Sequence, residues 1–396
     1  MRSDAGSVAR PLAVTLAIQT LVALAVYCAP VMAPVAARDL GVHPSAIGWF
    51  IATTYLGAMV GSATAGGWLA RFGPIRVSQL GLALCLAGLA LAAASSSLPL
   101  VALGAFVIGL GYGPATPASS VILVRAAPPS VFSLTFSIKQ TGVPAGAAIA
   151  GAMVPALILA LGWRGGALAI GLACLALALA IEPSRRRYDR DLDSRAPISL
   201  GAAFSPVAMV LRARGLRAMA VTSFVYGGVQ ITLVTYLVTF LTESFAMTLV
   251  FAGLVMAASQ VASVAGRVLW GVLADRLIAR RVMLGLLGLG MGISALVTLA
   301  AGPGWPAWLL FAYAAVFGAT AVGWNGVFLA EVARLAPAGR TSETTGGCLF
   351  FTFLGVVVTP PAFNAAFALL GSYSAAYAVF GVPALAVGAW LLASRA

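Results

Sequence analysis

The chain has 396 residues, of which 61% are hydrophobic and only 8% are charged, and its formal net charge is +13. A soluble globular domain carries about 25% charged residues, because these cover much of its surface. The composition therefore excludes a water-soluble enzyme and a disordered protein, and it favours helices packed in a lipid bilayer. The positive charge does not indicate nucleic-acid binding, because the arginines stand between apolar runs instead of along one helix face.

Apolar runs long enough to cross a membrane follow one another along the whole chain. In the first half they cover 12–37, 46–70, 76–95, 98–124, 132–160 and 163–182, and in the second half 216–241, 249–273, 281–302, 305–330, 345–370 and 373–393. A helix rises about 1.5 Å per residue, so each run can span about 30 Å of hydrocarbon. The short alternating segments of a membrane β-barrel are absent. We therefore predict an all-α membrane protein with twelve transmembrane helices.

The only long connection runs from Glu182 to Gly215 and mixes arginine, aspartate and proline. It predicts a cytoplasmic linker, 183–214, between two six-helix halves, 1–182 and 215–396. Placing both termini in the cytoplasm puts 19 of the 23 Lys and Arg residues on that side. This asymmetry predicts a multi-pass protein of a bacterial-type inner (plasma) membrane.

Residues that would hold a metal or cofactor are scarce in the sequence. The only histidine is His43, and the four cysteines lie inside apolar runs without C-x-x-C spacing. No phosphate-binding G-x-x-x-x-G-K motif is present, and no nucleophile–base pair stands out. We therefore expect no cofactor, no metal site and no enzymatic activity.

A loop sequence occurs twice, at corresponding places in the two halves. The first copy, GWLARFGPIR, begins at Gly67, and the second, GVLADRLIARR, begins 204 residues later at Gly271. Internal duplication in a membrane protein with many helices indicates a transporter whose binding site lies where the repeats meet.

This loop resembles the signature loop of the major facilitator superfamily, Gly-x-Leu-Ala-Asp-Arg after an even-numbered helix. The second copy matches it at Gly271, Leu273, Ala274, Asp275 and Arg276. The first copy keeps Gly67, Leu69, Ala70 and Arg71, followed by Gly73 and Arg76, but it lacks the aspartate. The resemblance implies a twelve-helix secondary transporter that works by alternating access.

The resemblance also implies that charges of these loops hold the two halves together on the cytoplasmic side when the protein is open outward. The expected gating residues are Gly67, Arg71, Gly271, Asp275, Arg276, Glu331 and Glu343. Glu331 and Glu343 are the expected partners of Arg276 or Arg280. The alternative interpretation is that these are solvated charges that only set the membrane topology.

Two basic residues fall inside apolar runs, where an ionisable side chain is costly and usually functional. Lys139 is the only lysine of the chain, and Arg267 precedes Asp275 by eight residues. No carboxylate within a span is an obvious partner for either, so a bound anion would neutralise them. The alternatives are that Lys139 extends to the membrane surface, and that Arg267 bonds helix carbonyls or Glu343.

The superfamily resemblance places the helices of Lys139 and Arg267 next to each other, so that both would face one cavity. The position of Arg267 is similar to that of the anion-binding arginine in the oxalate/formate antiporter and the monocarboxylate carriers. Those antiporters carry a lysine in the eleventh helix, and this chain has none there. A small organic anion is the expected substrate, and export of hydrophobic drugs is the alternative.

Polar residues in the helices expected to line the cavity are further candidates, because polar groups in lipid need partners or water. The residues expected to contact the substrate, besides the two cations, are Gln140, Gln19, Tyr27, Tyr226, Gln230 and Asn325. No Asp or Glu is expected deep inside a span, which favours exchange, uniport or co-transport of the anion with its own proton. The expected partners are an anionic small molecule and the lipid bilayer, with the chain acting as a monomer. A receptor or scaffold with an inactive transporter fold is a further alternative.

Overall fold

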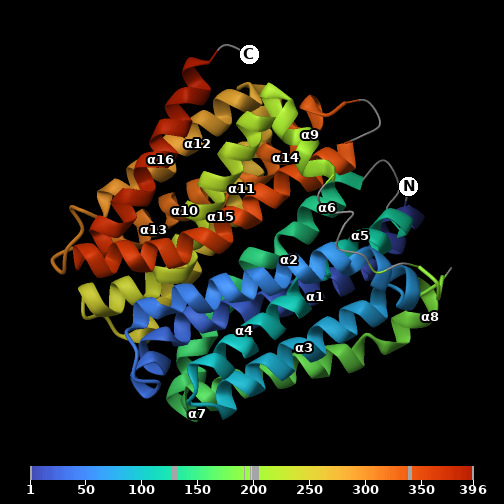
Figure 1. Cartoon of the computed structure of the whole chain (residues 1–396), viewed down its shortest axis with the longest axis horizontal. Coiled ribbons are helices and arrows are strands. Elements are labelled where there is room, and N and C mark those ends of the chain that lie inside the picture. Colours follow the sequence, from blue (N-terminus) through green and yellow to red (C-terminus); the bar gives the residue numbers. More distant parts are fainter. Residues whose placement is uncertain are drawn as a thin grey trace. The chain divides into compact units, whose positions relative to one another are not determined.

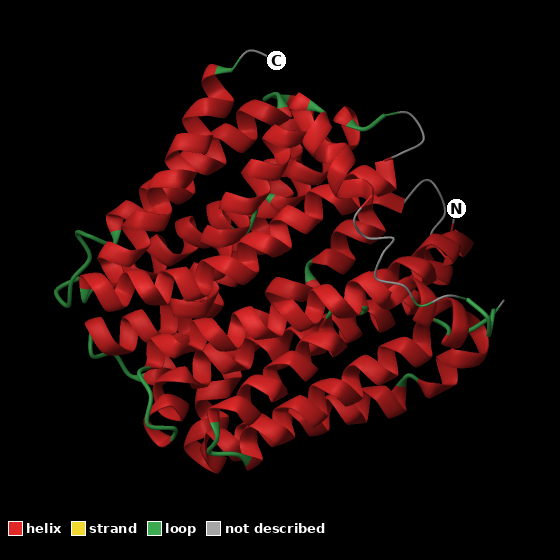
Figure 2. Cartoon of the chain, viewed as in Figure 1, coloured by secondary structure: helices red, strands yellow, loops and turns green. Residues whose placement is uncertain are grey.

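The computed structural model describes residues 2–126, 132–190, 192–196, 198, 205–337 and 341–394. These residues form helices joined by short loops, and no strand occurs among them (Figure 2). The prediction of an all-α membrane protein is confirmed.

The helices of the first half are shown in Figure 1 in blue to green. They are α1 (Arg2–Asp39), α2 (Ile47–Phe72), α3 (Pro74–Ala94), α4 (Leu98–Tyr112), α5 (Ala115–Ala126), α6 (Phe132–Gln140), α7 (Gly142–Ala180) and α8 (Arg185–Tyr188). Short 3-10 turns precede α2, at Pro44–Ala46, and α8, at Glu182–Ser184.

The helices of the second half are shown in yellow-green to red (Figure 1). They are α9 (Ser205–Arg212), α10 (Arg214–Ser244), α11 (Leu249–Arg276), α12 (Arg280–Val297), α13 (Ala307–Ala321), α14 (Asn325–Leu335), α15 (Thr341–Leu370) and α16 (Tyr373–Ala393).

Eleven helical segments of the described residues are long and apolar enough to cross a membrane. The longest, Ile138–Tyr188, has 51 residues and is interrupted at Gly162, whose φ of 69° and ψ of 169° are not helical. Glycine adopts this positive φ without the steric cost that other residues bear. The predicted runs 132–160 and 163–182 lie on the two sides of this break, and the count of twelve spans stays a prediction.

The chain divides into two compact units. Unit 1 contains Met1–Val42 and Thr53–Leu200, and unit 2 contains His43–Ala52 and Gly201–Ala396. Helix α2 therefore begins in unit 2 and continues in unit 1. The predicted linker, 183–214, is divided between the two units, and its first part packs with unit 1.

Close backbone contacts hold the helices of unit 1 together. Gly109 of α4 lies against α2 so closely that a Cβ atom there would overlap the carbonyl oxygen of Thr54. Gly57 of α2 faces the carbonyl of Phe106 of α4 in the same way. Glycine therefore lets α2 and α4 approach each other more closely than larger residues would allow.

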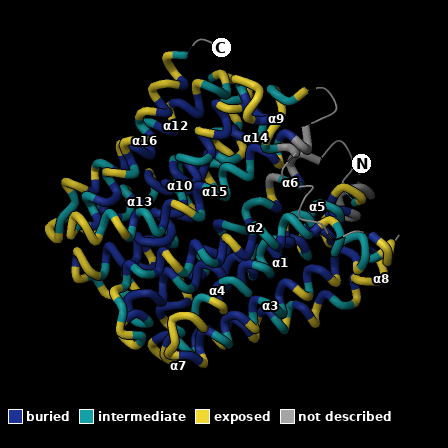
Figure 3. Tube along the Cα trace, in the orientation of Figure 1, coloured by how far each residue is buried: buried dark blue, intermediate teal, exposed yellow. Residues whose placement is uncertain are grey.

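The burial pattern is that of helices that face lipid on the outside (Figure 3). Large apolar side chains are well exposed, among them Leu159 at 77% and Leu369 at 87%. A surface facing water does not carry so many exposed leucines and valines, whereas hydrocarbon solvates them. All four cysteines are buried and form no disulfide.

Candidate functional site

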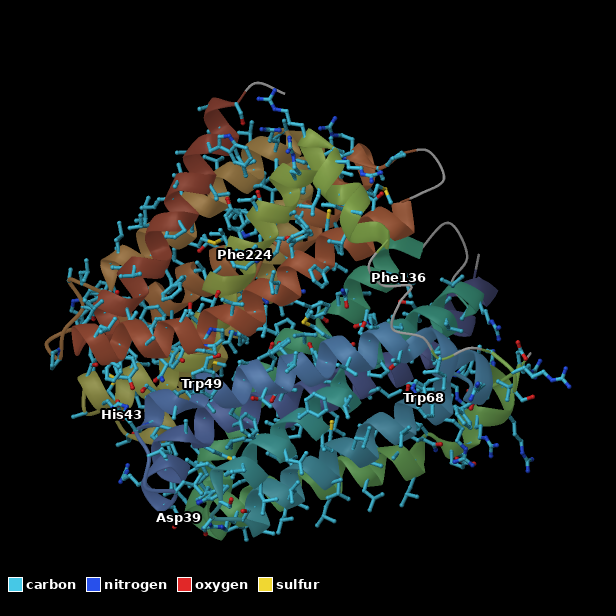
Figure 4. All side chains as sticks on the ribbon, viewed as in Figure 1. Asp39, His43, Trp49, Trp68, Phe136 and Phe224 are labelled. Atoms are coloured by element: carbon cyan, nitrogen blue, oxygen red, sulfur yellow. The ribbon has the colours of Figure 1, made fainter. Side chains whose placement is uncertain are left out.

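Lys139 lies at the end of α6, one residue before the helix ends, and its side chain is only 1% exposed. Figure 4 marks Phe136, three residues earlier on the same helix. The Nζ atom of Lys139 donates to Oγ1 of Thr116 at 3.1 Å and to Oε1 of Gln140 at 3.2 Å. Both acceptors are neutral. The ammonium is therefore held inside unit 1 and does not extend to a surface.

Thr116, at the start of α5, connects Lys139 to Gln19 of α1. A hydroxyl has one donor, and an ammonium can only donate, so Thr116 accepts from Lys139 and gives its own proton to Oε1 of Gln19 at 3.2 Å. The interruption between α4 and α5 at Pro114 places Thr116 in the first turn of α5. This arrangement joins three helices of unit 1 through a single row of hydrogen bonds.

The Gln19 amide and the Lys139 ammonium both have N–H donors without an acceptor among the described residues. Oε1 of Gln19 accepts from Thr116, so the Gln19 side chain turns its NH2 group elsewhere, and no described residue accepts from it. The ammonium has three N–H bonds and two acceptors in the described part of the chain. The ion pairs among the described residues do not include Lys139. The row therefore offers N–H groups to an acceptor, and it brings one positive charge when Lys139 is protonated.

A second polar cluster lies in unit 2, around Oε1 of Gln230 on α10. This oxygen accepts from Nε1 of Trp324 at 3.0 Å and from Nδ2 of Asn325 at 3.1 Å. An indole N–H can only donate, which fixes the orientation of the Gln230 amide. Nδ2 of Asn325 also donates to the carbonyl of Val322. Among the described residues, Oδ1 of Asn325 and Nε2 of Gln230 have no partner and can bond another molecule.

Two tyrosines predicted to contact the substrate are bonded within their own units. The hydroxyl of Tyr27 lies 2.7 Å from that of Tyr55 in unit 1. The Tyr226 hydroxyl donates to the Leu284 carbonyl at 2.8 Å in unit 2, and its ring meets Trp324 edge-on with centroids 5.7 Å apart. Tyr226 thus supports the ring that donates to Gln230, and a direct contact with substrate stays a prediction for both tyrosines.

Arg267 lies on α11 in unit 2 and is half-buried. The neighbouring face of α11 packs on α13, where Nε1 of Trp270 donates to the carbonyl of Ala319 at 2.8 Å. Because Lys139 belongs to unit 1 and Arg267 to unit 2, each is placed by its own unit. The expectation that both cations face one cavity stays a prediction.

The pairing expected for Glu331 is wrong in this structure. The carboxylate of Glu331 accepts two hydrogen bonds from Arg334, at 2.9 and 2.7 Å, three residues along α14. Arg280 pairs instead with Asp275 at 3.0 Å, across the turn between α11 and α12. Residues three apart on a helix are neighbours, so Arg334 reaches Glu331 without any contribution from another helix. The side chain of Glu343 lies outside the described residues.

Glu331 is a buried acidic residue near the end of an apolar segment, so the expectation that no acidic residue lies deep in a span stays a prediction. It is 2% exposed and lies within the apolar helical segment Ala307–Leu335. The predicted apolar run ended at residue 330, one position earlier, and the helix continues because α14 keeps its apolar face to Leu335. The sequence does contain a signal for this burial, namely the arginine three residues later. An arginine at that spacing can pair with the carboxylate on the same helix face.

The first signature loop, at the end of α2, differs in its contacts from the second. Gly67 lies in α2, and Trp68, marked in Figure 4, stacks on Phe72 with centroids 5.5 Å apart. Nε of Arg71 donates to the carbonyl of Ala196 at 2.7 Å. This bond ties the loop to the segment that follows α8, a contact that the sequence analysis missed.

Comparison with known proteins identifies the family. The profile of the Major Facilitator Superfamily matches residues 15–360 and 219–396. The chain belongs to this superfamily and is a membrane transporter, not an enzyme. A search of curated proteins finds no match.

Solved structures with the same fold include several transporters. A POT family transporter in complex with 5-aminolevulinic acid is 14% identical, with a TM-score of 0.78 over 97% of this chain and 95% of that one. A mutant of the nucleoside transporter NupG is 14% identical, with a TM-score of 0.78 over 96% and 99%. A variant of the E. coli fucose:proton symporter, FucP, is 19% identical, with a TM-score of 0.65 over 98% and 100%. At these identities the likeness shows the fold alone.

Proposed function

We propose that this transporter carries a small organic anion with a carboxylate group, and that it works by alternating access of its two repeats. The observation that carries the proposal is the row of hydrogen bonds around Lys139. Lys139 has no ion pair with a carboxylate in the described part of the chain, and burying an unpaired ammonium is costly. A visiting carboxylate removes this cost, because its two oxygens accept the N–H groups that the row leaves unused.

Arg267 supports the proposal from unit 2. It is the second basic residue inside an apolar helix, and it lies on α11, eight residues before the signature-loop aspartate. A guanidinium can donate two parallel hydrogen bonds to one carboxylate, which an ammonium cannot do. We propose that Arg267 contacts the anion during the transport cycle and that Lys139 supplies the second positive charge.

The Gln230 cluster indicates what the rest of the substrate is like. Nε2 of Gln230 can donate and Oδ1 of Asn325 can accept, and both residues are only half-buried. A hydroxyl group satisfies a donor and an acceptor together, because it can accept and donate at once. We therefore propose a polar carboxylate, such as a hydroxy acid, in preference to a fatty acid.

The alternative, export of hydrophobic drugs, has less support. An aromatic cluster of unit 2 includes Tyr236, Phe240, Phe363 and Tyr377, and each of these is at most 2% exposed. Their rings pack on one another, for example Tyr236 on Phe363 with centroids 4.2 Å apart. These rings fill the interior of the unit, and they leave little surface for an apolar ligand.

Thermal unfolding of the purified protein tests the proposal. At about 100 times its Kd a ligand stabilises the folded state by about 2.7 kcal/mol, so a panel of hydroxy acids, fatty acids and cationic dyes can be ranked by their shifts in Tm. We expect shifts with hydroxy acids that disappear in Lys139→Met, which has a similar shape and no charge. The matched control is Arg10→Gln, which removes a positive charge from the exposed part of α1.

The result that rejects the proposal is a panel in which dyes stabilise the protein, carboxylates do not, and Lys139→Met behaves as the parent. We also propose a plasma-membrane location with both termini in the cytoplasm, because this orientation satisfies the positive-inside rule. Protease accessibility of tags at the two ends, in spheroplasts and in inverted vesicles, tests that orientation.

A further inference from the structure

The two signature loops are related residue by residue through the 204-residue offset. Asp275 of the second loop corresponds to Arg71 of the first, and Arg280 corresponds to Arg76. In the second loop the Asp275 carboxylate pairs with Arg280 at 3.0 Å and so links the end of α11 to the start of α12. The first loop has a basic residue at both of these positions, so it needs a carboxylate from another segment.

Glu182 supplies the carboxylate that pairs with Arg76, at 3.2 Å. Asp189, directly after α8, brings a second carboxylate to the backbone of the same loop. Its Oδ1 accepts from the backbone N–H of Ile75 at 2.7 Å, and its Oδ2 accepts from that of Arg76 at 3.1 Å. These N–H groups belong to the first turn of α3, where no helical carbonyl can accept them. The positive end of the helix dipole favours a negative charge at the same place. Helices α8 and α3 lie side by side (Figure 1).

Gly73 makes room for this carboxylate. It has a φ of 85°, in the region where other residues are strained, and a Cβ atom built on it would overlap the side chain of Asp189. The loop sequence therefore suits a carboxylate that arrives from outside the loop.

Further hydrogen bonds hold other described residues of the segment 182–196 to the same loop. The backbone N–H of Asp193 donates to the carbonyl of Ala70 at 2.9 Å, and Arg71 donates to Ala196. Glu182 accepts from Arg76 at 3.2 Å and from Gln79 at 2.8 Å. The segment is thus bonded to the end of α2, to the loop and to the start of α3.

We propose that Asp189 does in the first loop what Asp275 does in the second: it is a positioning residue that fixes the turn between the two helices. Because Asp189 belongs to the linker segment 182–196, this segment and the α2–α3 loop move as one body during transport. Burial raises the pKa of the Asp189 carboxyl, and the two backbone N–H groups, with Arg185 and Arg76 nearby, oppose that rise. The contacts that position the Asp189 side chain therefore also favour its ionised form.

Limited digestion with trypsin tests the proposal in the purified, full-length protein. The segment contains five arginines, Arg185, Arg186, Arg187, Arg190 and Arg195, and trypsin cuts after them where the backbone opens. We expect Asp189→Asn to increase the rate of cleavage in this segment about tenfold, because the amide has one acceptor oxygen and no charge.

The matched control is Asp193→Asn. Among the described residues, the Asp193 side chain accepts from the backbone N–H of Arg195, two residues on, and an asparagine oxygen can accept that bond equally well. We expect this variant to be cleaved at the parent rate. Equal rates for Asp189→Asn and Asp193→Asn would overturn the proposal.

A second variant, Gly73→Ala, displaces the carboxylate without altering any charge. If Gly73 and Asp189 act on the same contact, the double variant is cleaved no faster than the faster single variant. A double variant whose increase in cleavage rate equals the product of the two single increases would contradict the proposal. A transport assay adds an independent readout, in which Asp189→Asn lowers Vmax and leaves KM unchanged. Digestion needs no substrate, so its outcome stands apart from the proposed carboxylate specificity.

Discussion

The indole N–H of Trp324 donates to Oε1 of Gln230 at 3.0 Å, and Trp324 itself is fully buried. Because the donor is fixed by packing against Tyr226 and Phe328, the amide of Gln230 has only one satisfactory orientation. The half-buried Gln230 side chain is thereby held by a ring that has no contact with solvent. The arrangement explains how a flexible glutamine can present its NH2 group in a defined direction.

Replacing Trp324 by phenylalanine tests whether the indole N–H orients the Gln230 amide, apart from the packing of the ring. Trp324→Phe keeps a ring against Tyr226 and Phe328 but removes the N–H. If the proposed carboxylate is the substrate, we expect its KM to rise about fivefold with little loss of stability. Uptake measured in vesicles gives KM, and thermal unfolding gives stability. Trp270→Phe is the control, because Trp270 bonds a helix carbonyl, and it should lower Tm without raising KM.

Thr116→Val tests whether the row of hydrogen bonds positions Lys139. Valine has the shape of threonine without the hydroxyl, so the ammonium loses one of two acceptors and Gln19 loses its donor. We expect the apparent Kd for a carboxylate to rise about tenfold, which corresponds to about 1.4 kcal/mol. Thr64→Val, whose hydroxyl bonds only to its own helix, should bind as the parent does. A loss of affinity as large in Thr64→Val would assign the effect to general destabilisation.

The Glu331–Arg334 pair should respond unequally to removal of its two members. Arg334→Ala leaves a carboxylate that is 2% exposed without its two hydrogen bonds, at a cost of about 2 kcal/mol. Glu331→Gln leaves an arginine that is more than half exposed and can be hydrated, so it should cost less, about 1 kcal/mol. Chemical denaturation of the two variants in the same detergent measures the difference, and the reverse order would contradict this account.

We expect opposite effects on folding from two glycine substitutions in unit 1, Gly109→Ala and Gly66→Ala. A methyl group at Gly109 overlaps the backbone of α2, which cannot move aside cheaply, so we expect greatly reduced amounts of folded protein. At Gly66 nothing lies within 4 Å of the added atom, and alanine is the better helix former by about 1 kcal/mol. Size-exclusion chromatography of the two variants compares them, and equal yields would show that the close contact at Gly109 is unimportant.

Composition and apolar runs were sufficient to predict the all-helical membrane fold, because lipid requires every spanning segment to satisfy its own backbone. The break at Gly162 was also visible, since it falls between two predicted runs. The partners of charged residues were less predictable. Glu331 pairs within its own helix, and the loop of Arg71 bonds to a segment more than a hundred residues away. Such contacts depend on packing that no local pattern encodes.

Among the candidate site residues, Lys139, Gln140 and Gln19 meet in one row, and Gln230 meets Asn325 in another. The sequence identified these residues as polar groups inside apolar runs, which is a strong signal in lipid. It did not show that Tyr27 and Tyr226 bond within their own units. The sequence pattern of an inward-facing tyrosine is the same whether its hydroxyl bonds a ligand or a neighbouring helix.

The burial of Cys28, Cys85, Cys174 and Cys348 has a practical consequence. A maleimide reaches thiols that water reaches, so the natural chain should label slowly as long as it stays folded. One cysteine introduced at a chosen position then reports its own accessibility over a low background. The movement of individual helices between states can therefore be followed in a chain that keeps all of its native residues except one.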